Sequence, residues 1–149
     1  MQSPEVQSIV KRVRYATIST VDESGSPWAA PVWYVYDNQN NIYWWSPVDS
    51  QHSRNIMLND RVYITIFDSS APEGDGVGLY IRANASKVPD DELDSVIEIY
   101  NAATTKFKLD LSNTTGNAPT RLYKAVPITI QINDGVESDG FYKDIRKDI

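Results

Sequence analysis

The chain has 149 residues, of which 41% are hydrophobic and 23% are charged, and its 14 Lys and Arg against 20 Asp and Glu give a net charge of −6. This composition indicates one globular domain over residues 1–149, and the negative balance argues against a protein that mainly binds nucleic acid or an anionic membrane. The absence of cysteine excludes disulfides, thiolate metal sites and a cysteine nucleophile. With a single histidine, His52, most zinc sites are also excluded, so we expect no metal site. In a Ser-His-Asp hydrolase, His52 would have to be the catalytic histidine.

No apolar run approaches the roughly 18 residues that a membrane span requires. The first residues, MQSPEVQSIVKR, do not resemble a signal peptide. We therefore expect a cytoplasmic protein.

The first third of the chain predicts a helix followed by three strands. Ser3 is a suitable N-cap and Pro4 suits the first turn, before apolar residues at helical spacing. Strands are predicted at residues 15–22, 28–36 and 41–46, with short polar turns between them. Pro31 interrupts the second strand and should mark a bulge or an unpaired position.

The middle of the chain predicts a short helix and two strands. Asp49 or Ser50 can cap a helix within residues 47–59, with Ile56 and Met57 turned toward the core. Residues 61–67 and 76–86 alternate apolar and polar side chains, which predicts two strands that each bury one face.

The last third predicts a helix and a long strand. Asp90 is the expected N-cap of a helix whose apolar residues are Leu93, Val96, Ile97 and Tyr100. Residues 111–119 form a predicted loop, and residues 121–133 a strand with Ile128, Ile130 and Ile132 facing inward. The order α-β-β-β-α-β-β-α-β, with connections too short for parallel crossovers, predicts a mainly β (α+β) fold, an antiparallel barrel with peripheral helices.

Residues 43–62 (YWWSPVDSQHSRNIMLNDRV) are the stretch most suggestive of chemistry. A strand ends in aromatic residues, and a helix then begins with Ser50, Gln51, His52, Ser53 and Arg54. The first turn of a helix offers unpaired N–H groups, and hydroxyls with an arginine beside them could hold a phosphate. The alternative is that Ser50 only caps the helix while His52 and Arg54 face solvent.

Residues 15–66, YATISTVDESGSPWAAPVWYVYDNQNNIYWWSPVDSQHSRNIMLNDRVYITI, resemble the pyridoxamine 5'-phosphate oxidase-like, FMN-binding split-barrel superfamily. The resemblance lies in the strand ATxxTVDxxGxPxxxPVWYxxD, the strand xIYxxS and the helix ending RNIxxxxRV. It extends to about Val88 and resumes more weakly in the tail GFYKDIRKDI. It implies a six-stranded antiparallel split barrel, a homodimer and an FMN site at the dimer interface.

The resemblance also implies which residues hold the cofactor. The phosphate would lie at the turn between strand and helix, and the flavin ring against the second and third strands near Trp44 and its neighbours. The cofactor-binding residues expected on this basis are Pro31, Val32, Trp33, Trp45, Ser46, Ser50, Gln51, His52, Arg54 and Asn55. For the substrate layer we expect Tyr34, Tyr80, Arg82 and the loop at residues 69–75.

One departure from the family pattern affects the phosphate site. Relatives carry an Arg/Lys pair in this turn, with Lys at the position of His52, whereas this chain has Ser50, Gln51 and His52. Each charged hydrogen bond contributes roughly 1.5–3 kcal/mol, so losing two fixed cations could weaken phosphate binding by a few kcal/mol. Arg54 and a protonated His52 would compensate in part.

Three functions follow from the residues and the resemblance. The first is a flavin-dependent oxidoreductase with FMN and a small-molecule substrate, in which the flavin carries the electrons and no catalytic residue can be named. Dedicated pyridoxamine phosphate oxidation is not expected, because no C-terminal substrate-binding segment is recognisable. The second is a deazaflavin-dependent reductase, and the third is a non-catalytic protein that carries a flavin, a heme or another ring compound.

The adjacent tryptophans Trp44 and Trp45 bear on all three functions. Because side chains alternate along a strand, one of them should face the barrel interior and the other the partner subunit or the ligand.

Overall fold

The computed structural model describes residues 3–133, 136–138, 140–143 and 145–149. The helices are α1 (Pro4–Arg12), α2 (Gln51–Leu58) and α3 (Leu93–Ala103), with 3₁₀ turns η1 (Asp90–Glu92) and η2 (Leu111–Asn113). The strands are β1 (Tyr15–Val21), β2 (Pro27–Tyr36), β3 (Ile42–Pro47), β4 (Arg61–Phe67), β5 (Gly78–Lys87), β6 (Thr120–Asn133), β7 (Val136–Ser138), β8 (Phe141–Lys143) and β9 (Arg146–Asp148).

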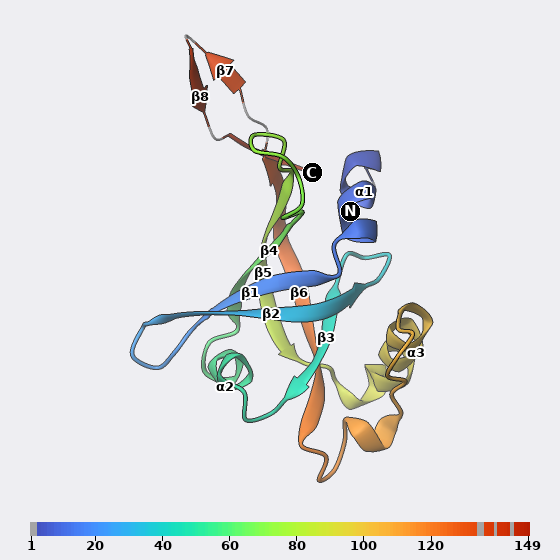
Figure 1. Ribbon diagram of the computed structural model, residues 1–149. Coiled ribbons are helices and arrows are strands. Elements are labelled where there is room, and N and C mark those ends of the chain that lie inside the picture. The colour runs from blue at the N-terminus through green and yellow to red at the C-terminus, as the bar shows by residue number, and fades with distance from the viewer. Residues whose placement is uncertain (1–2, 134–135, 139, 144) are drawn as a thin grey trace.

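Six strands close into an antiparallel barrel (Figure 1). The order is β3-β2-β1-β4-β5-β6, and the first half of β6 pairs back onto β3 from Ile42↔Ala125 to Pro47↔Thr120. The far end of β6 pairs with the short β9, while β7 and β8 form a separate hairpin. The fold is therefore a mainly β split barrel, which confirms the fold class predicted from the sequence.

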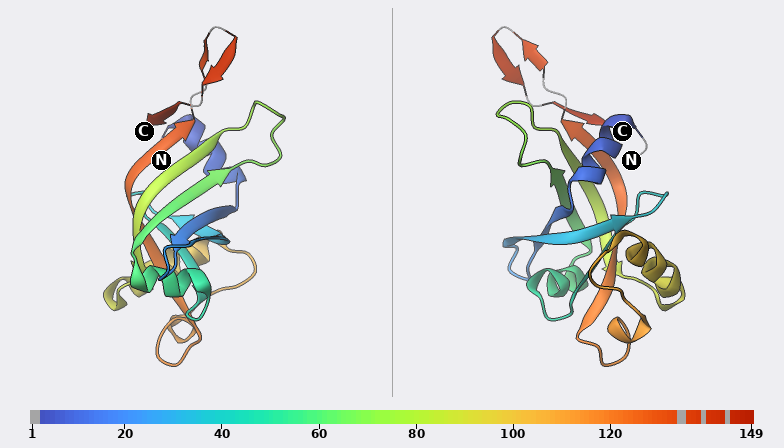
Figure 2. Two further views of the ribbon diagram at one scale, coloured as in Figure 1. Left: turned by 90° about the vertical axis from the view of Figure 1, so that its left-hand side faces the viewer. Right: turned by 45° about the vertical axis from the view of Figure 1, so that its right-hand side comes forward.

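The barrel interior is apolar and continuous with α1. The alternating residues of β1, β4 and β5 supply side chains with no exposed surface, including Ile18, Ile64 and Ile81. Figure 2 shows α1 and α2 at opposite ends of the barrel. Val6 and Ile9 of α1 belong to the same core cluster as the strands, so α1 covers one end of the barrel.

A second core cluster lies outside the barrel, beneath α3. It joins Val35, Tyr43 and Leu122 from the outer faces of β2, β3 and β6 to Val96 and Tyr100 of α3. Where these strands lie between the barrel interior and α3, at residues 34–35, 43–44 and 122–123, both of their faces are buried.

The two adjacent tryptophans of β3 point to opposite faces of the strand, as the alternation predicts, but the outward one packs against this chain itself, and its contact with a partner subunit or ligand stays a prediction. Trp44 is fully buried in the barrel and stacks on Tyr123, with ring centroids 5.7 Å apart. Trp45 packs in the outer cluster and donates from Nε1 to the carbonyl oxygen of Asn113 at 3.4 Å.

Four local expectations are wrong. Met57 is 60% exposed, because it lies on the solvent side of α2. Ile128 is 62% exposed, because Arg82 pairs with Thr129 and Ala83 with Pro127, which leaves Ile128 as the extra residue of a β-bulge.

The other two concern caps and proline. Asp90 begins η1 and caps nothing with its side chain, and α3 starts at Leu93. Pro31 pairs with Thr17 in unbroken register; the part of β2 that contains it pairs only with β1, so its missing N–H disrupts no ladder with β3.

Within the part of the chain that the structure describes, no helix has the length and apolar character needed to cross a membrane.

Candidate functional site

The first turn of α2 follows directly from the end of β3. Ser50 adopts extended backbone angles and its Oγ accepts a hydrogen bond from the Ser53 N–H at 3.4 Å, which makes it the N-cap. Its own N–H bonds to the Pro47 carbonyl at 3.3 Å, so the chain turns sharply from strand to helix. The N–H groups of Gln51 and His52 are too early in the helix to have intrahelical partners, and they point out of its N-terminal end.

His52 lies between two hydroxyls at this turn. Its Nε2 is 3.0 Å from Ser46 Oγ at the end of β3 and 3.3 Å from Ser50 Oγ. Burial lowers the pKa of His52 below its ordinary value of 6.5, so the ring is neutral at pH 7. The cluster therefore joins two hydroxyls through a neutral imidazole.

Arg54 supplies the positive charge of the turn. Its side chain is exposed and folds back toward the N-terminus of α2, where Nη2 donates to Gln51 Oε1 at 2.6 Å and Nη1 donates to the Asp49 carbonyl. Both acceptors are neutral groups. An anionic ligand could therefore replace them without breaking an ion pair.

Asn55 has a different position from the rest of the predicted set. Its side chain is 1% exposed; Nδ2 donates to Thr20 Oγ1 of β1 at 2.9 Å, and Oδ1 accepts from Gln51 Nε2 at 2.8 Å. These contacts anchor α2 to the barrel.

Ser53 belongs to the predicted first turn of the helix, but it is not among the expected cofactor-binding residues. Its side chain has no exposed surface, and its Oγ lies 2.8 Å from Ser50 Oγ. Its position three residues after the N-cap was the available signal, because this is where a capping partner is expected.

The structure thus brings Ser46, Ser50, Gln51, His52 and Arg54 together at one end of the barrel. The β2 residues of the predicted set are split between two faces. Val32 points into the barrel core, whereas Pro31 is exposed and Trp33 lies partly buried on the outer face, edge-on to Tyr100 with centroids 4.9 Å apart.

The residues expected in a substrate layer do not gather in one place. Tyr34 is buried and donates to the Val13 carbonyl at 3.2 Å, and burial raises the pKa of its phenol. Tyr80 lies on the outer face of β5 beneath the guanidinium of Arg146, 3.9 Å from the ring centroid. Arg82 is exposed on the same strand.

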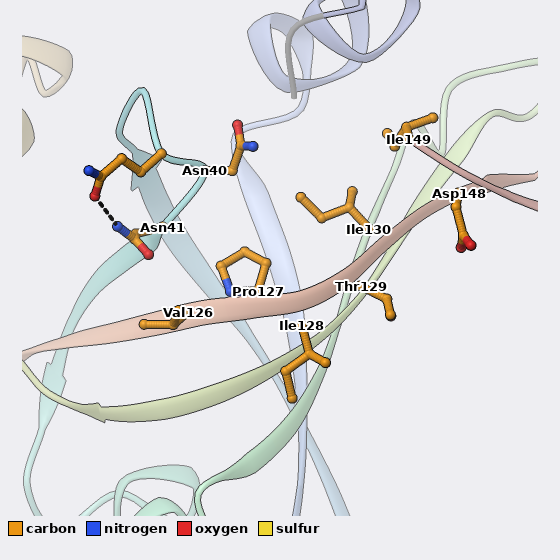
Figure 3. A pocket seen from close by; sticks show the side chains of 10 residues that line it. Asn40, Asn41, Val126, Pro127, Ile128, Thr129, Ile130, Asp148 and Ile149 are labelled. Atoms are coloured by element: carbon orange, nitrogen blue, oxygen red, sulfur yellow. Dashed lines mark hydrogen bonds between the residues drawn. The ribbon is translucent and has the colours of Figure 1, made fainter.

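A hollow of about 410 Å³ lies where β6 passes from β3 to β9 (Figure 3). Val126, Ile128 and Ile149 line it together with the polar residues Asn41 and Asp148. No cationic side chain lines it among the described residues, so it does not resemble the phosphate site expected from the sequence.

The fold and the α2 turn define a split-barrel protein. A family model described as pyridoxamine 5'-phosphate oxidase matches residues 2–131, and the chain belongs to this family. No curated protein sequence matches the chain.

Solved structures share the fold at low sequence identity. The heme storage protein HutZ from Vibrio cholerae is 22% identical with a TM-score of 0.72, over 84% of this chain and 89% of that one. A FAD-binding protein (mll6688) from Mesorhizobium loti is 15% identical with a TM-score of 0.60, over 89% and 94%. An F420 reductase is 19% identical with a TM-score of 0.60, over 83% and 94%. The chain spans 56% of two other, longer similar structures.

Proposed function

We propose that this protein binds FMN and is a flavin-dependent oxidoreductase. The observation that carries the proposal is the polar cluster of Ser46, Ser50, His52 and Arg54 at the N-terminal end of α2, in a chain that belongs to the pyridoxamine 5'-phosphate oxidase family. Helix N–H groups, hydroxyls and a guanidinium are the groups that bind phosphate. The donor set therefore fits the phosphate of FMN.

In this proposal each group has a separate task. The N–H groups of Gln51 and His52 and the hydroxyl of Ser50 would donate to the phosphate, while Arg54 would turn from Gln51 and Asp49 to neutralise it. Pro31 and Trp33, on the outer face of β2, would orient the ring. A bound flavin supplies electron transfer, which leaves binding, orientation and exclusion of water to the protein.

We propose that a second copy of the chain completes this site. Residues 27–33 of β2 pair with β1 alone among the described strands, and Trp28 on this edge is 48% exposed. An exposed strand edge carrying a large aromatic side chain is a favourable surface for association. Light scattering should show a dimer, and Trp28→Ser should shift it toward the monomer; a monomeric parent protein would contradict this part of the proposal.

The cofactor is tested by the absorption spectrum of the purified protein, with mass analysis of any released ligand. FMN, a deazaflavin and heme give different spectra, so one measurement separates the three candidates. Heme is the less favoured candidate here, because the chain has no cysteine and its single histidine lies in the turn proposed for the phosphate. A colourless protein that gains no thermal stability with excess FMN would contradict the flavin proposal.

The phosphate site is tested by comparing FMN with riboflavin, which lacks the phosphate. Arg54→Ala should weaken FMN binding about tenfold or more, the equivalent of one charged hydrogen bond, and leave riboflavin binding unchanged. Arg61→Ala is the matched control, because Arg61 is exposed at the start of β4 and outside the turn. Equal losses for both ligands would place the phosphate elsewhere.

A further inference from the structure

The barrel interior contains a polar layer beneath α2. Thr20, Ser46, Ser53 and Asn55 are buried polar side chains, and each of them belongs to α2 or contacts one of its side chains. An unmade hydrogen bond in the interior is costly, so the partner of every buried polar group near this layer has to be identified.

Tyr123 of β6 carries a buried hydroxyl whose proton is not used. Its side chain has no exposed surface and stacks on Trp44, and neither Tyr123 Oη nor Trp44 Nε1 has a hydrogen-bond partner among the described residues. Burial raises the pKa of the Tyr123 phenol, whereas the Ser53 hydroxyl and the charge of Arg121 act against this rise. Because Arg121 is the cross-strand neighbour of Ser46, the phenol oxygen lies toward the α2 end of the barrel, near Ser53.

The hydroxyl of Ser50 has more acceptors around it than it has protons. Its Oγ lies 3.0 Å from the Pro47 carbonyl oxygen, 2.8 Å from Ser53 Oγ and 3.3 Å from His52 Nε2. A serine hydroxyl carries one hydrogen, so it can donate to one of these acceptors at a time. When that hydrogen points to the buried Ser53, it points away from any ligand at the turn.

We propose that Tyr123 is a positioning residue for the anion site at the turn. When Ser50 turns its hydrogen to an anionic ligand, Ser53 Oγ loses the donor that lies 2.8 Å away, and the unused hydroxyl of Tyr123 replaces it. Tyr123 then donates to Ser53, and Ser50 donates to the ligand. This inference rests on the proposed phosphate site at α2, but it concerns a residue that does not contact the ligand.

The first test is made on the full-length protein without ligand, with Tyr34→Phe as the matched control. Tyr34 is also buried and pairs with Trp44 from the other side, but its hydroxyl donates to the Val13 carbonyl oxygen at 3.2 Å. Tyr34→Phe should lower the melting temperature because an acceptor loses its donor, whereas Tyr123→Phe should leave it unchanged or raise it. An equal loss in both variants would show that the Tyr123 hydroxyl already has a partner, which would overturn the proposal.

The second test compares the binding of FMN and riboflavin by calorimetry. Tyr123→Phe should weaken FMN binding about threefold to tenfold, the loss of one neutral hydrogen bond, and leave riboflavin binding unchanged. Tyr34→Phe should change neither. Ser53→Ala removes the link between Tyr123 and Ser50, so the double variant Ser53→Ala/Tyr123→Phe should bind FMN no more weakly than Ser53→Ala alone.

The outcomes separate this inference from the proposed function. A parent protein that does not bind FMN would contradict both. If the parent binds FMN and Arg54→Ala weakens that binding but Tyr123→Phe does not, the phosphate site stands and the role of Tyr123 is overturned. The role is also overturned if Tyr123→Phe weakens riboflavin as much as FMN, or if its effect adds fully to that of Ser53→Ala, because Tyr123 would then not act through Ser53 and Ser50.

Discussion

The barrel interior and the first turn of α2 differ in the kind of contact that their side chains make. In the interior, Ile18, Ile64 and Ile81 have no exposed surface and make only apolar contacts. At the turn, Ser46, Ser50 and His52 contact one another through polar atoms, and His52 remains partly exposed. A ligand cannot replace the apolar contacts of the interior without a loss of stability, whereas it can replace the polar contacts of the turn. The interior therefore accounts for most of the stability, and the turn is suited to binding.

The largest effect should come from the interior. Ile81→Ala removes buried methyl groups and leaves a cavity, which should lower the free energy of unfolding by about 2–5 kcal/mol. Ile128→Ala is the matched control, because this isoleucine protrudes at the bulge and is 62% exposed; its loss should cost about 0.5 kcal/mol or less. Similar losses in urea denaturation would mean that the interior is not where stability resides.

Asn55 tests the boundary between the two regions, because it belongs to α2 but is buried. Asn55→Ala removes the bonds to Thr20 and Gln51 and leaves the buried Thr20 hydroxyl without this donor, which should cost about 1–3 kcal/mol. A double-mutant cycle with Thr20→Val should give a clear coupling energy. Strict additivity would show that this bond does not hold the helix on the barrel.

A smaller loss of unfolding free energy is expected when either of two helix N-caps is removed, and its size should differ between them. Ser50 of α2 and Ser3 of α1 each accept a hydrogen bond at 3.4 Å, but only Ser50 also contacts His52 and Ser53. Ser3→Ala should cost about 1 kcal/mol, as ordinary caps do, and Ser50→Ala somewhat more, because His52 and Ser53 also lose a partner. If chemical denaturation gives the same loss of unfolding free energy for both variants, Ser50 acts only as an ordinary helix cap.

The sequence predicted the interior better than the turn, and the reason is physical. A period of two places Val62, Ile64 and Ile66 on one face of β4 without knowledge of any other strand, and the structure buries all three. The same alternation wrongly placed Ile128 inside, because the bulge at this residue depends on the pairing of β5 with β6 and not on the local pattern.

At the turn, the helix and its cap at Ser50 were predictable, because capping is local. The contact of His52 with Ser46 joins a helix to the preceding strand, and the bond from Asn55 to Thr20 spans 35 residues.

The smallest effect should be the pH dependence that His52 gives to the turn. Burial lowers its pKa in the folded protein below the ordinary value of 6.5, so the unfolded chain takes up a proton first as the pH falls. The contribution of the neutral His52 ring to the free energy of unfolding is therefore fully present above about pH 6.5 and is lost as the pH falls through the pKa of His52 in the folded protein. Because His52 is the only histidine, His52→Gln should remove this slope in urea titrations between pH 5 and 7.

A ligand phosphate should oppose this slope if it lies beside His52. A dianion at the turn favours the protonated ring and raises its pKa, so saturating FMN should reduce or reverse the decline in stability below pH 6.5. Riboflavin, which lacks the phosphate, should leave the slope as it is in the free protein. An identical slope with both ligands would show that the phosphate does not lie beside His52. The polar contacts of the turn would then stabilise the fold, as the apolar contacts of the interior do.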